Sequence, residues 1–172
     1  MVLISWCLKT KNGLELVEPN NNMSQSYLQM AEESIRVLQN IKDSQIWTAT
    51  TTYYIFYYSL YAFMLRAGIK CEIHSCSIEF MKQFLTEHYT NEDISMIQKA
   101  FQARIDLQYY ADRPVDQAMI NETKKYCKEF YIKTKLAIST LSEDSIHTIR
   151  EELVQITTPE NIPQKPEEPK RH

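Results

Sequence analysis

Glycine is scarce in this chain of 172 residues and occurs only at Gly13 and Gly68. Glycine-rich phosphate loops and dinucleotide-binding turns need several glycines at fixed spacing, so both are excluded. Two glycines also cannot supply the turns of an all-β sandwich or barrel. The composition therefore favours a mostly helical protein, and the length suits one domain.

The sequence also lacks a strong excess of charge, because 19 Lys and Arg residues stand against 22 Asp and Glu residues. A net charge of −3 gives no global attraction for nucleic acid, so any RNA contact has to be local. The opening residues form a short apolar run without the small-residue cleavage site of a secretory signal. We therefore expect a cytoplasmic protein with reduced thiols at Cys7, Cys71, Cys76 and Cys127.

Motifs for metal binding and for nucleophilic catalysis are missing as well. The tight spacing of a zinc knuckle is not found among Cys71, His74, Cys76 and His88. Cys76 has no recognisable third group to orient a neighbouring histidine, which disfavours a cysteine hydrolase. The Glu-x-x-His motif of di-iron bundles is absent, so we expect no metal and no cofactor.

One segment resembles a membrane span by length, because residues 46–65 form 20 consecutive uncharged positions. This run contains five tyrosines together with four hydroxyls from threonine and one from serine. Each hydroxyl would need a hydrogen-bond partner in the bilayer, and tyrosine prefers the membrane interface to its centre. A long helix buried on most sides inside a bundle or dimer fits the run better.

Apolar residues at three- and four-residue spacing predict a series of helices with short connections. Ser24 is expected to cap the first helix. The second helix covers about residues 45–67 and stops at Gly68, and the third covers about residues 75–88. Thr90 and Asp93 form the start of a fourth helix, and Pro114 opens a fifth that runs to about Leu141.

These elements predict an all-α fold, an antiparallel up-and-down bundle of about five helices over residues 23–141. Residues 1–22 precede it as an irregular lead-in with a short strand near residues 14–17. Ser142 is expected to cap an additional helix over residues 142–156. Residues 157–172 hold four of the six prolines and almost no apolar residues, which predicts a disordered tail.

The most unusual segment runs from Phe101 to Pro114 and combines Arg104, Asp106, Tyr109 and Tyr110. Arginine can hold a phosphate in a bidentate fork, and tyrosine can stack on a base or donate a proton. The alternative is that Arg104 pairs with a carboxylate inside the bundle while the tyrosines fill its end. The residues alone leave both interpretations open.

The tyrosine-rich run of residues 52–70, the pair His74–Ser75 and the segment Phe101–Arg104 together resemble the sequence signature of HEPN-domain proteins. The resemblance covers about residues 23–140. It implies a bundle of four or five helices that usually forms a homodimer. Many members of the family are metal-independent ribonucleases, and others pair with minimal nucleotidyltransferases in toxin–antitoxin modules.

In that family an arginine is followed, after four to six residues, by a histidine. Arg104 matches the arginine, but Tyr109, Tyr110 and Ala111 stand where the histidine would lie. Arg104 with Asp106 and Tyr109 looks closer to a subgroup in which an alanine-aspartate-tyrosine run follows the arginine.

The missing histidine argues against catalysis, because tyrosine titrates near pH 10 and is a poor base at neutral pH. We expect a dimeric module that binds a nucleotide or RNA phosphate in a cleft around Arg104. Asp106 would orient the arginine, and Tyr109 or Tyr110 would stack or donate a hydrogen bond. The alternatives are a metal-independent ribonuclease with tyrosine in place of histidine, and a structural partner of a nucleotidyltransferase.

Overall fold

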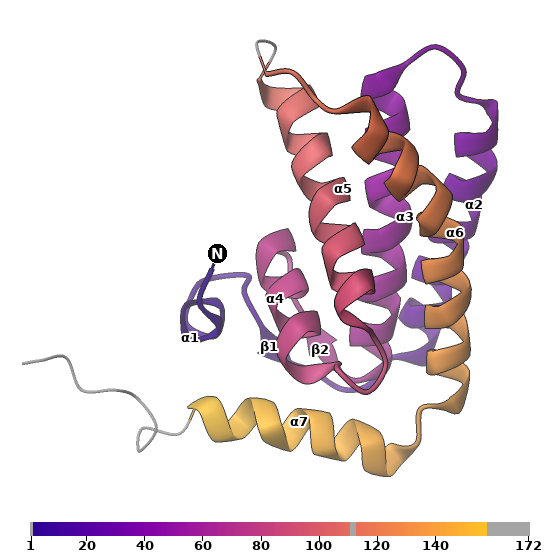
Figure 1. The fold of residues 1–172 in the computed structure, drawn as a ribbon. Helices are drawn as coiled ribbons and strands as arrows, with labels where there is room; N and C mark the ends of the chain where they lie inside the picture. The colour runs from indigo at the N-terminus through magenta and orange to yellow at the C-terminus, as the bar shows by residue number, and fades with distance from the viewer. Residues whose placement is uncertain (1, 111–112, 158–172) are drawn as a thin grey trace, which may run out of the picture.

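The computed structural model describes residues 2–110 and 113–157 of the chain. Its four long helices stand side by side in an up-and-down arrangement (Figure 1): α2 (Asn21–Asn40), α3 (Gln45–Arg66), α5 (Asn91–Tyr109) and α6 (Gln117–Thr140). The shorter α4 (His74–Phe84) lies beside α5, and α7 (Glu143–Thr157) crosses the end of the bundle. The predicted all-α class is confirmed. The described residues hold seven helices, one more than the bundle of about five and the additional C-terminal helix that the sequence predicts, because α1 was not expected.

Helix α3 forms the centre of the bundle and packs against α2, α5 and α6. Its large side chains Tyr53, Phe56, Leu60 and Phe63 are completely buried. Each such side chain contributes about 1.5–3 kcal/mol, because folding removes its apolar surface from water.

Helix α3 contains the uncharged run of residues 46–65, which resembles a membrane span by length. None of the helices in the described ranges combines the length and the hydropathy that crossing a membrane requires.

The helix starts follow the predicted capping chemistry in part. Thr90 and Asp93 form a complete capping box at α5, and the Ser142 hydroxyl accepts a hydrogen bond from the Ser145 N–H at 3.1 Å, at the start of α7. The Gly68 backbone, with a φ of 73°, follows the end of α3 as expected. The predicted boundaries of α3 and of the helix after Ser142 therefore hold to within one or two residues.

Two predicted helix starts are wrong. Helix α2 begins earlier than Ser24, because the Asn20 side chain accepts a hydrogen bond from the Met23 N–H at 2.9 Å. Helix α6 begins after Pro114, because the Asp116 side chain accepts a hydrogen bond from the Ala118 N–H at 2.8 Å. In both places an Asx side chain caps the helix, as this residue type does readily.

The lead-in of residues 2–20 is more ordered than the sequence predicts. It contains the short helix α1 (Ile4–Cys7) and the strand β1 (Glu15–Leu16), which lies in the segment where a strand was expected. Strand β1 pairs in antiparallel fashion with β2 (Ile69–Lys70). Residues 158–172, most of the expected disordered tail, lie outside the described residues.

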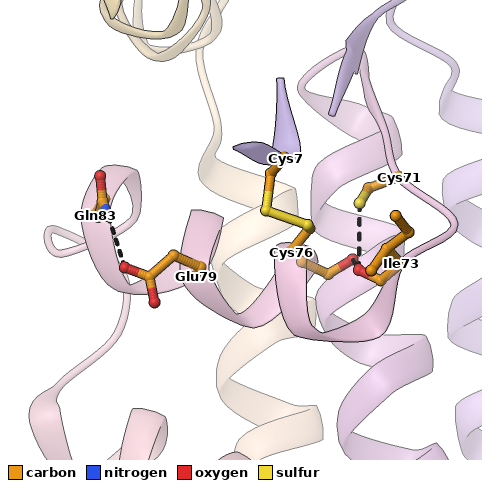
Figure 2. The surroundings of a disulfide bond; sticks show 7 residues. Cys7, Cys71, Ile73, Cys76, Glu79 and Gln83 are labelled. Carbon is orange, nitrogen blue, oxygen red and sulfur yellow. Dashed lines mark hydrogen bonds between the residues drawn. A yellow bond between two sulfur atoms is a disulfide. The ribbon is translucent and has the colours of Figure 1, made fainter. Parts of the chain in front are cut away.

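A disulfide joins Cys7 of α1 to Cys76 of α4, across a sequence separation of 69 residues (Figure 2). The expectation of four reduced thiols is therefore wrong for this pair, while Cys71 and Cys127 are free and buried. Positions this distant in the chain meet only through the packing of α1 on α4, which a sequence pattern does not encode. The bond fixes the lead-in to the first turns of α4, which also carries His74.

Candidate functional site: a half-buried arginine among aromatic rings

Helix α5 holds its position through Asp93, a fully buried carboxylate in its first turn. The carboxylate accepts hydrogen bonds from Lys133 Nζ at 2.7 Å and from the Tyr126 hydroxyl at 2.9 Å, both on α6. Burial alone would raise the pKa of Asp93, but the hydrogen bonds from Lys133, Thr90 and Tyr126 outweigh it, so the pKa lies below the usual value. This network sets the register of α5 against α6 and so positions Arg104, which lies three turns further along α5.

The guanidinium of Arg104 lies among tyrosine rings. Its Cζ atom is 5.9 Å from the ring centroid of Tyr53, 5.8 Å from that of Tyr54 and 5.4 Å from that of Tyr109. These are cation–π distances, and each contact of this kind contributes about 0.5–1 kcal/mol at an exposed site. The rings therefore hold the guanidinium without neutralising its charge.

Arg104 has no carboxylate partner among the residues that the structure describes, and its buried Nε has no hydrogen-bond partner there. The alternative interpretation, in which Arg104 pairs with a carboxylate inside the bundle, is therefore wrong within the described part of the chain. A buried N–H group without a partner costs about 1–3 kcal/mol, more when the group is charged. An acceptor from a bound molecule would remove that cost.

A histidine lies beside Arg104 although none follows it on the same helix. His74 is the first residue of α4, its Nδ1 lies 2.6 Å from the Tyr53 hydroxyl, and its ring stacks on Tyr57 at a centroid distance of 3.9 Å. Burial and the neighbouring charge of Arg104 lower the pKa of His74 to about 4. The imidazole is therefore neutral at pH 7.

An open cavity of about 450 Å³ connects these groups. Its wall is formed by the side chains Ile73, His74, Ser75, Phe101, Arg104, Ile105, Tyr109 and Tyr110. Tyr109 is 66% exposed and Tyr110 is 41% exposed, so both rings stand at the mouth of the cavity. The predicted residues Arg104, Tyr109 and Tyr110 are thus brought together, with His74 as an addition from another helix.

The expected role of Asp106 is wrong, because its carboxylate does not contact Arg104. It accepts hydrogen bonds from Gln102 Nε2 at 2.9 Å and forms an ion pair with Arg113 at 3.1 Å. The Gln102 hydrogen bond, followed by Arg113, holds the pKa of Asp106 below its usual value. On a helix, Asp106 faces away from Arg104, and its carboxylate meets Gln102 on the same helix and Arg113 beyond the helix end instead.

Arg113 also stacks on Tyr110, with its Cζ atom 3.5 Å from the ring centroid. The Arg113–Asp106 pair thereby holds Tyr110 at the cavity mouth. Asp106 is a positioning residue for this tyrosine and not for the arginine that the sequence suggested.

Neither a metal site nor a free nucleophilic thiol is found here. No group of three or more His, Cys, Asp or Glu side chains within residues 2–110 and 113–157 is arranged to hold a metal ion. Cys76, the thiol nearest to His74 in sequence, is bonded to Cys7. The chemistry that the site offers is a fixed cation, a neutral imidazole, hydroxyl donors and aromatic faces.

No family model, curated protein or solved structure matches this chain. The fold and the site define the chain as an all-α bundle with an arginine that has no carboxylate partner within residues 2–110 and 113–157 and lies in an aromatic-walled cavity. The resemblance to HEPN-domain proteins stays a prediction.

Proposed function

We propose that the protein is a HEPN-type module that binds the phosphate of a nucleotide or an RNA at Arg104. The observation that carries this proposal is the guanidinium of Arg104, which faces an open cavity without a carboxylate partner in the described part of the chain. A permanent cation held by rings instead of by an anion keeps its capacity to bind one from outside. A phosphate oxygen would supply the missing acceptor.

The rest of the cavity suits the organic part of such a ligand. Tyr109 and Tyr110 expose ring surface at the mouth, and stacking on aromatic rings contributes about 1–3 kcal/mol per base. Stacking is tolerant of base identity, so the ligand would be recognised as a nucleotide or as single-stranded RNA without strong sequence preference. The net charge of −3 adds no further attraction, which keeps recognition local to this cavity.

The proposal includes a homodimer, in which two Arg104 cavities would approach each other. Large apolar side chains are exposed on α2 and at the start of α3, two helices that pack against each other: Met30 and Val37 of α2 and Trp47 of α3. Half-buried Tyr54 and Tyr58 continue this face along α3 to the guanidinium of Arg104. A second copy would cover this face. A minimal nucleotidyltransferase as a toxin–antitoxin partner belongs to the same proposal through the family resemblance. The cytoplasmic location stays a separate prediction, which the disulfide between Cys7 and Cys76 disfavours because disulfides are rare in the cytosol.

A second candidate function, metal-independent RNA cleavage, is favoured by His74. The sequence offered only Tyr109 as a substitute for the missing histidine, whereas the neutral imidazole of His74 lines the same cavity as Arg104. A neutral histidine can accept the proton of a ribose 2′-hydroxyl while the arginine stabilises the charge that develops on the phosphate. A bound phosphate would raise the low pKa of His74 and make it a better base.

The binding proposal is tested by titrating a fluorescent single-stranded RNA and a labelled nucleotide into the protein without metal. Arg104→Ala is expected to weaken binding by at least about tenfold, because a charge-assisted hydrogen bond contributes about 1.5–3 kcal/mol. Lys99→Ala is the matched control, since it removes a cation from the same helix that Glu122 already pairs at 2.8 Å. Equal affinity in the wild type and Arg104→Ala would refute the site.

The same samples distinguish the two candidate functions. A binding module leaves the RNA intact in every variant. Cleavage by the wild type that both Arg104→Ala and His74→Ala abolish would make the protein a ribonuclease. Cleavage that persists in both variants would come from a contaminant.

A further inference from the structure

A second and larger cavity, of about 640 Å³, lies near the bundle end where β1 and β2 pair. The start of α2, the second half of α3 and the residues around β2 form its walls. Tyr57 joins the two cavities, because it lines this one while its ring stacks on His74 of the other. The volume falls in the range of small-molecule sites, about 300–1,000 Å³.

Three tyrosine rings line this cavity. Tyr27 and Tyr61 are perpendicular, with an interplanar angle of 85° and centroids 4.8 Å apart, and so form a corner. The Tyr57 ring is parallel to that of Tyr61 at 5.7 Å and extends this wall along α3. Perpendicular aromatic walls of this kind are how proteins surround quaternary ammonium groups, because the ring faces are electron-rich.

The charges around the rings also favour a cation. Glu18, Lys70 and Glu72 line the cavity, and Lys70 is paired with Glu72 at 2.9 Å. The opposite charges of Lys70 and Glu72 cancel. The exposed carboxylate of Glu18 remains, and the structure gives it no ion pair within residues 2–110 and 113–157. The net charge at the cavity wall is therefore negative.

One donor that would otherwise favour an anion is already paired, and the three rings carry no cation from the described part of the chain. The Met23 N–H in the first turn of α2 donates to the Asn20 side chain instead of pointing into free space. The cations that the structure places over tyrosine rings are Arg104, Arg113 and Lys135, which lie over rings other than these three.

We propose that this cavity binds a small organic cation that carries N-methyl groups. The ammonium charge would lie against the Tyr27 and Tyr61 rings, its methyl groups would contact the apolar side chains Met23 and Leu65, and Glu18 would complement the charge. This site is separate from the Arg104 cavity and does not depend on phosphate binding there. A free small molecule and a methylated lysine of a peptide both present this group, and the experiment distinguishes the two sources.

The experiment is a calorimetric titration with choline and with its neutral carbon isostere, in which a tert-butyl group replaces the trimethylammonium group. The two probes have the same shape and differ in charge, so the ratio of their affinities isolates the electrostatic contribution. We expect choline to bind at least about fivefold more tightly than the isostere, as cation–π contacts predict. Equal affinities, or no binding of choline at millimolar concentration, would overturn the proposal.

Variants locate the site. Tyr27→Leu keeps an apolar residue at a half-buried position and is expected to reduce the preference for choline over the isostere. Glu18→Gln alters an exposed side chain that does not contribute to the core, and it should weaken choline binding without affecting folding. Tyr109→Leu and Arg104→Ala should leave choline binding unchanged. Loss of choline binding in Arg104→Ala, with binding unchanged in Tyr27→Leu, would place the cation in the Arg104 cavity and overturn the proposal.

A trimethyllysine peptide in the same titration distinguishes the sources. Binding tighter than that of choline would identify a methylated partner protein, and binding weaker than that of choline would identify a free small molecule. Arg104→Ala is titrated in the same series and should affect phosphate binding alone. A failure of the phosphate proposal can therefore be distinguished from a failure of the cation proposal.

Discussion

His74 and Arg104 show how a single residue acquires its chemistry from a neighbour on another helix. Both side chains line one cavity, and the stacking of His74 on Tyr57 keeps the imidazole away from water. Burial is the main reason that the pKa of His74 falls to about 4, and the positive charge of Arg104 adds to it. Phosphate binding would oppose the second effect, so His74 reports on what happens at Arg104.

The first prediction concerns this pKa. In a pH titration followed by NMR of the imidazole protons, His74 should titrate near pH 4 in the wild type. Arg104→Gln should move the pKa upward part of the way towards 6.5, because burial stays in place and only the charge is lost. Lys99→Gln is the control and should not change it. A wild-type pKa close to 6.5 would mean that the imidazole is not buried as described.

The same residue makes stability depend on pH. Because the folded-state pKa of His74 lies below the unfolded value, the unfolded chain binds the extra proton first. The stability that His74 contributes is fully present above about pH 6.5 and falls as the pH drops towards 4. His74→Gln should flatten that part of a urea-denaturation pH profile.

Sequence reasoning found Arg104 but not its surroundings. Arg104 fits the order Phe101-Gln-Ala-Arg of the family resemblance, and Asp106 is linked to it by closeness in the chain and by the subgroup that carries an aspartate after the arginine. His74 was missed as a site residue because only the packing of α4 on α5 brings it to Arg104. The pair His74–Ser75 is part of the family resemblance, so the sequence marks His74 as notable. It does not indicate that His74 lies beside Arg104.

At the scale of elements, α7 is joined to the rest of the chain by Arg150. Its Nη1 donates to the Val17 carbonyl at 2.6 Å and to the Gly68 carbonyl at 2.8 Å. One guanidinium thereby connects α7, the segment after β1 and the turn after α3. A Cβ atom at Gly68 would collide with this Arg150 nitrogen, and the φ of 73° already favours glycine.

The second prediction follows from that junction. Gly68→Ala should lower the free energy of unfolding by about 1–3 kcal/mol, because it combines backbone strain with displacement of Arg150. Urea denaturation measures the change, and hydrogen exchange should show faster opening of α7. Arg36→Ala on the exposed side of α2 is a control that should change stability by less than about 0.5 kcal/mol. An equally stable Gly68→Ala protein would contradict this account of the junction.

The third prediction concerns the link between α1 and α4. The disulfide closes a sequence separation of 69 residues, and a disulfide typically contributes about 2–4 kcal/mol of stabilisation. The double variant Cys7→Ala, Cys76→Ala should lose that amount in urea denaturation. A dithiol reductant should destabilise the wild type by a similar amount and leave the double variant unchanged. Stability that does not respond to reductant would mean that the bond does not form in solution.

Helix positions were easier to predict than helix starts. The apolar spacing identifies α2, α5 and α6 because each must bury one stripe, and the long uncharged run identifies α3 as a helix buried on most sides; both signals are local to the helix. The predicted starts at Ser24 and Pro114 are wrong because a nearby residue can cap each helix equally well. Asn20 caps α2, and Asp116 caps α6. The disulfide was missed because its two cysteines meet only in the folded chain.

At the scale of the whole molecule, the proposed homodimer depends on the exposed apolar face of α2 and α3. Val37 is 48% exposed and Trp47 is 61% exposed on that face. Monomeric proteins seldom leave large apolar side chains grouped in this way, since a partner copy would remove them from water. A dimer formed there would also cover part of the Tyr54 ring beside Arg104.

The fourth prediction tests this surface. Val37→Glu should shift the protein from dimer to monomer in analytical ultracentrifugation, because a charge would be buried in the interface. Leu136→Glu is the matched control: the residue is 64% exposed on α6, away from Arg104, and its replacement should leave the dimer intact. A wild-type protein that is monomeric at high concentration would refute the homodimer while leaving phosphate binding at Arg104 open to its own test.

The most direct measurement of the central claim is the NMR signal of the Arg104 Nε–H group, assigned by its loss in Arg104→Lys. This group is buried and lacks an acceptor among the described residues, so it should respond when an acceptor arrives. Titration with a nucleotide or a short single-stranded RNA should shift the signal downfield and slow its exchange with water. A ligand that binds while this signal stays unchanged would show that its phosphate lies elsewhere, and the account of the site would be wrong.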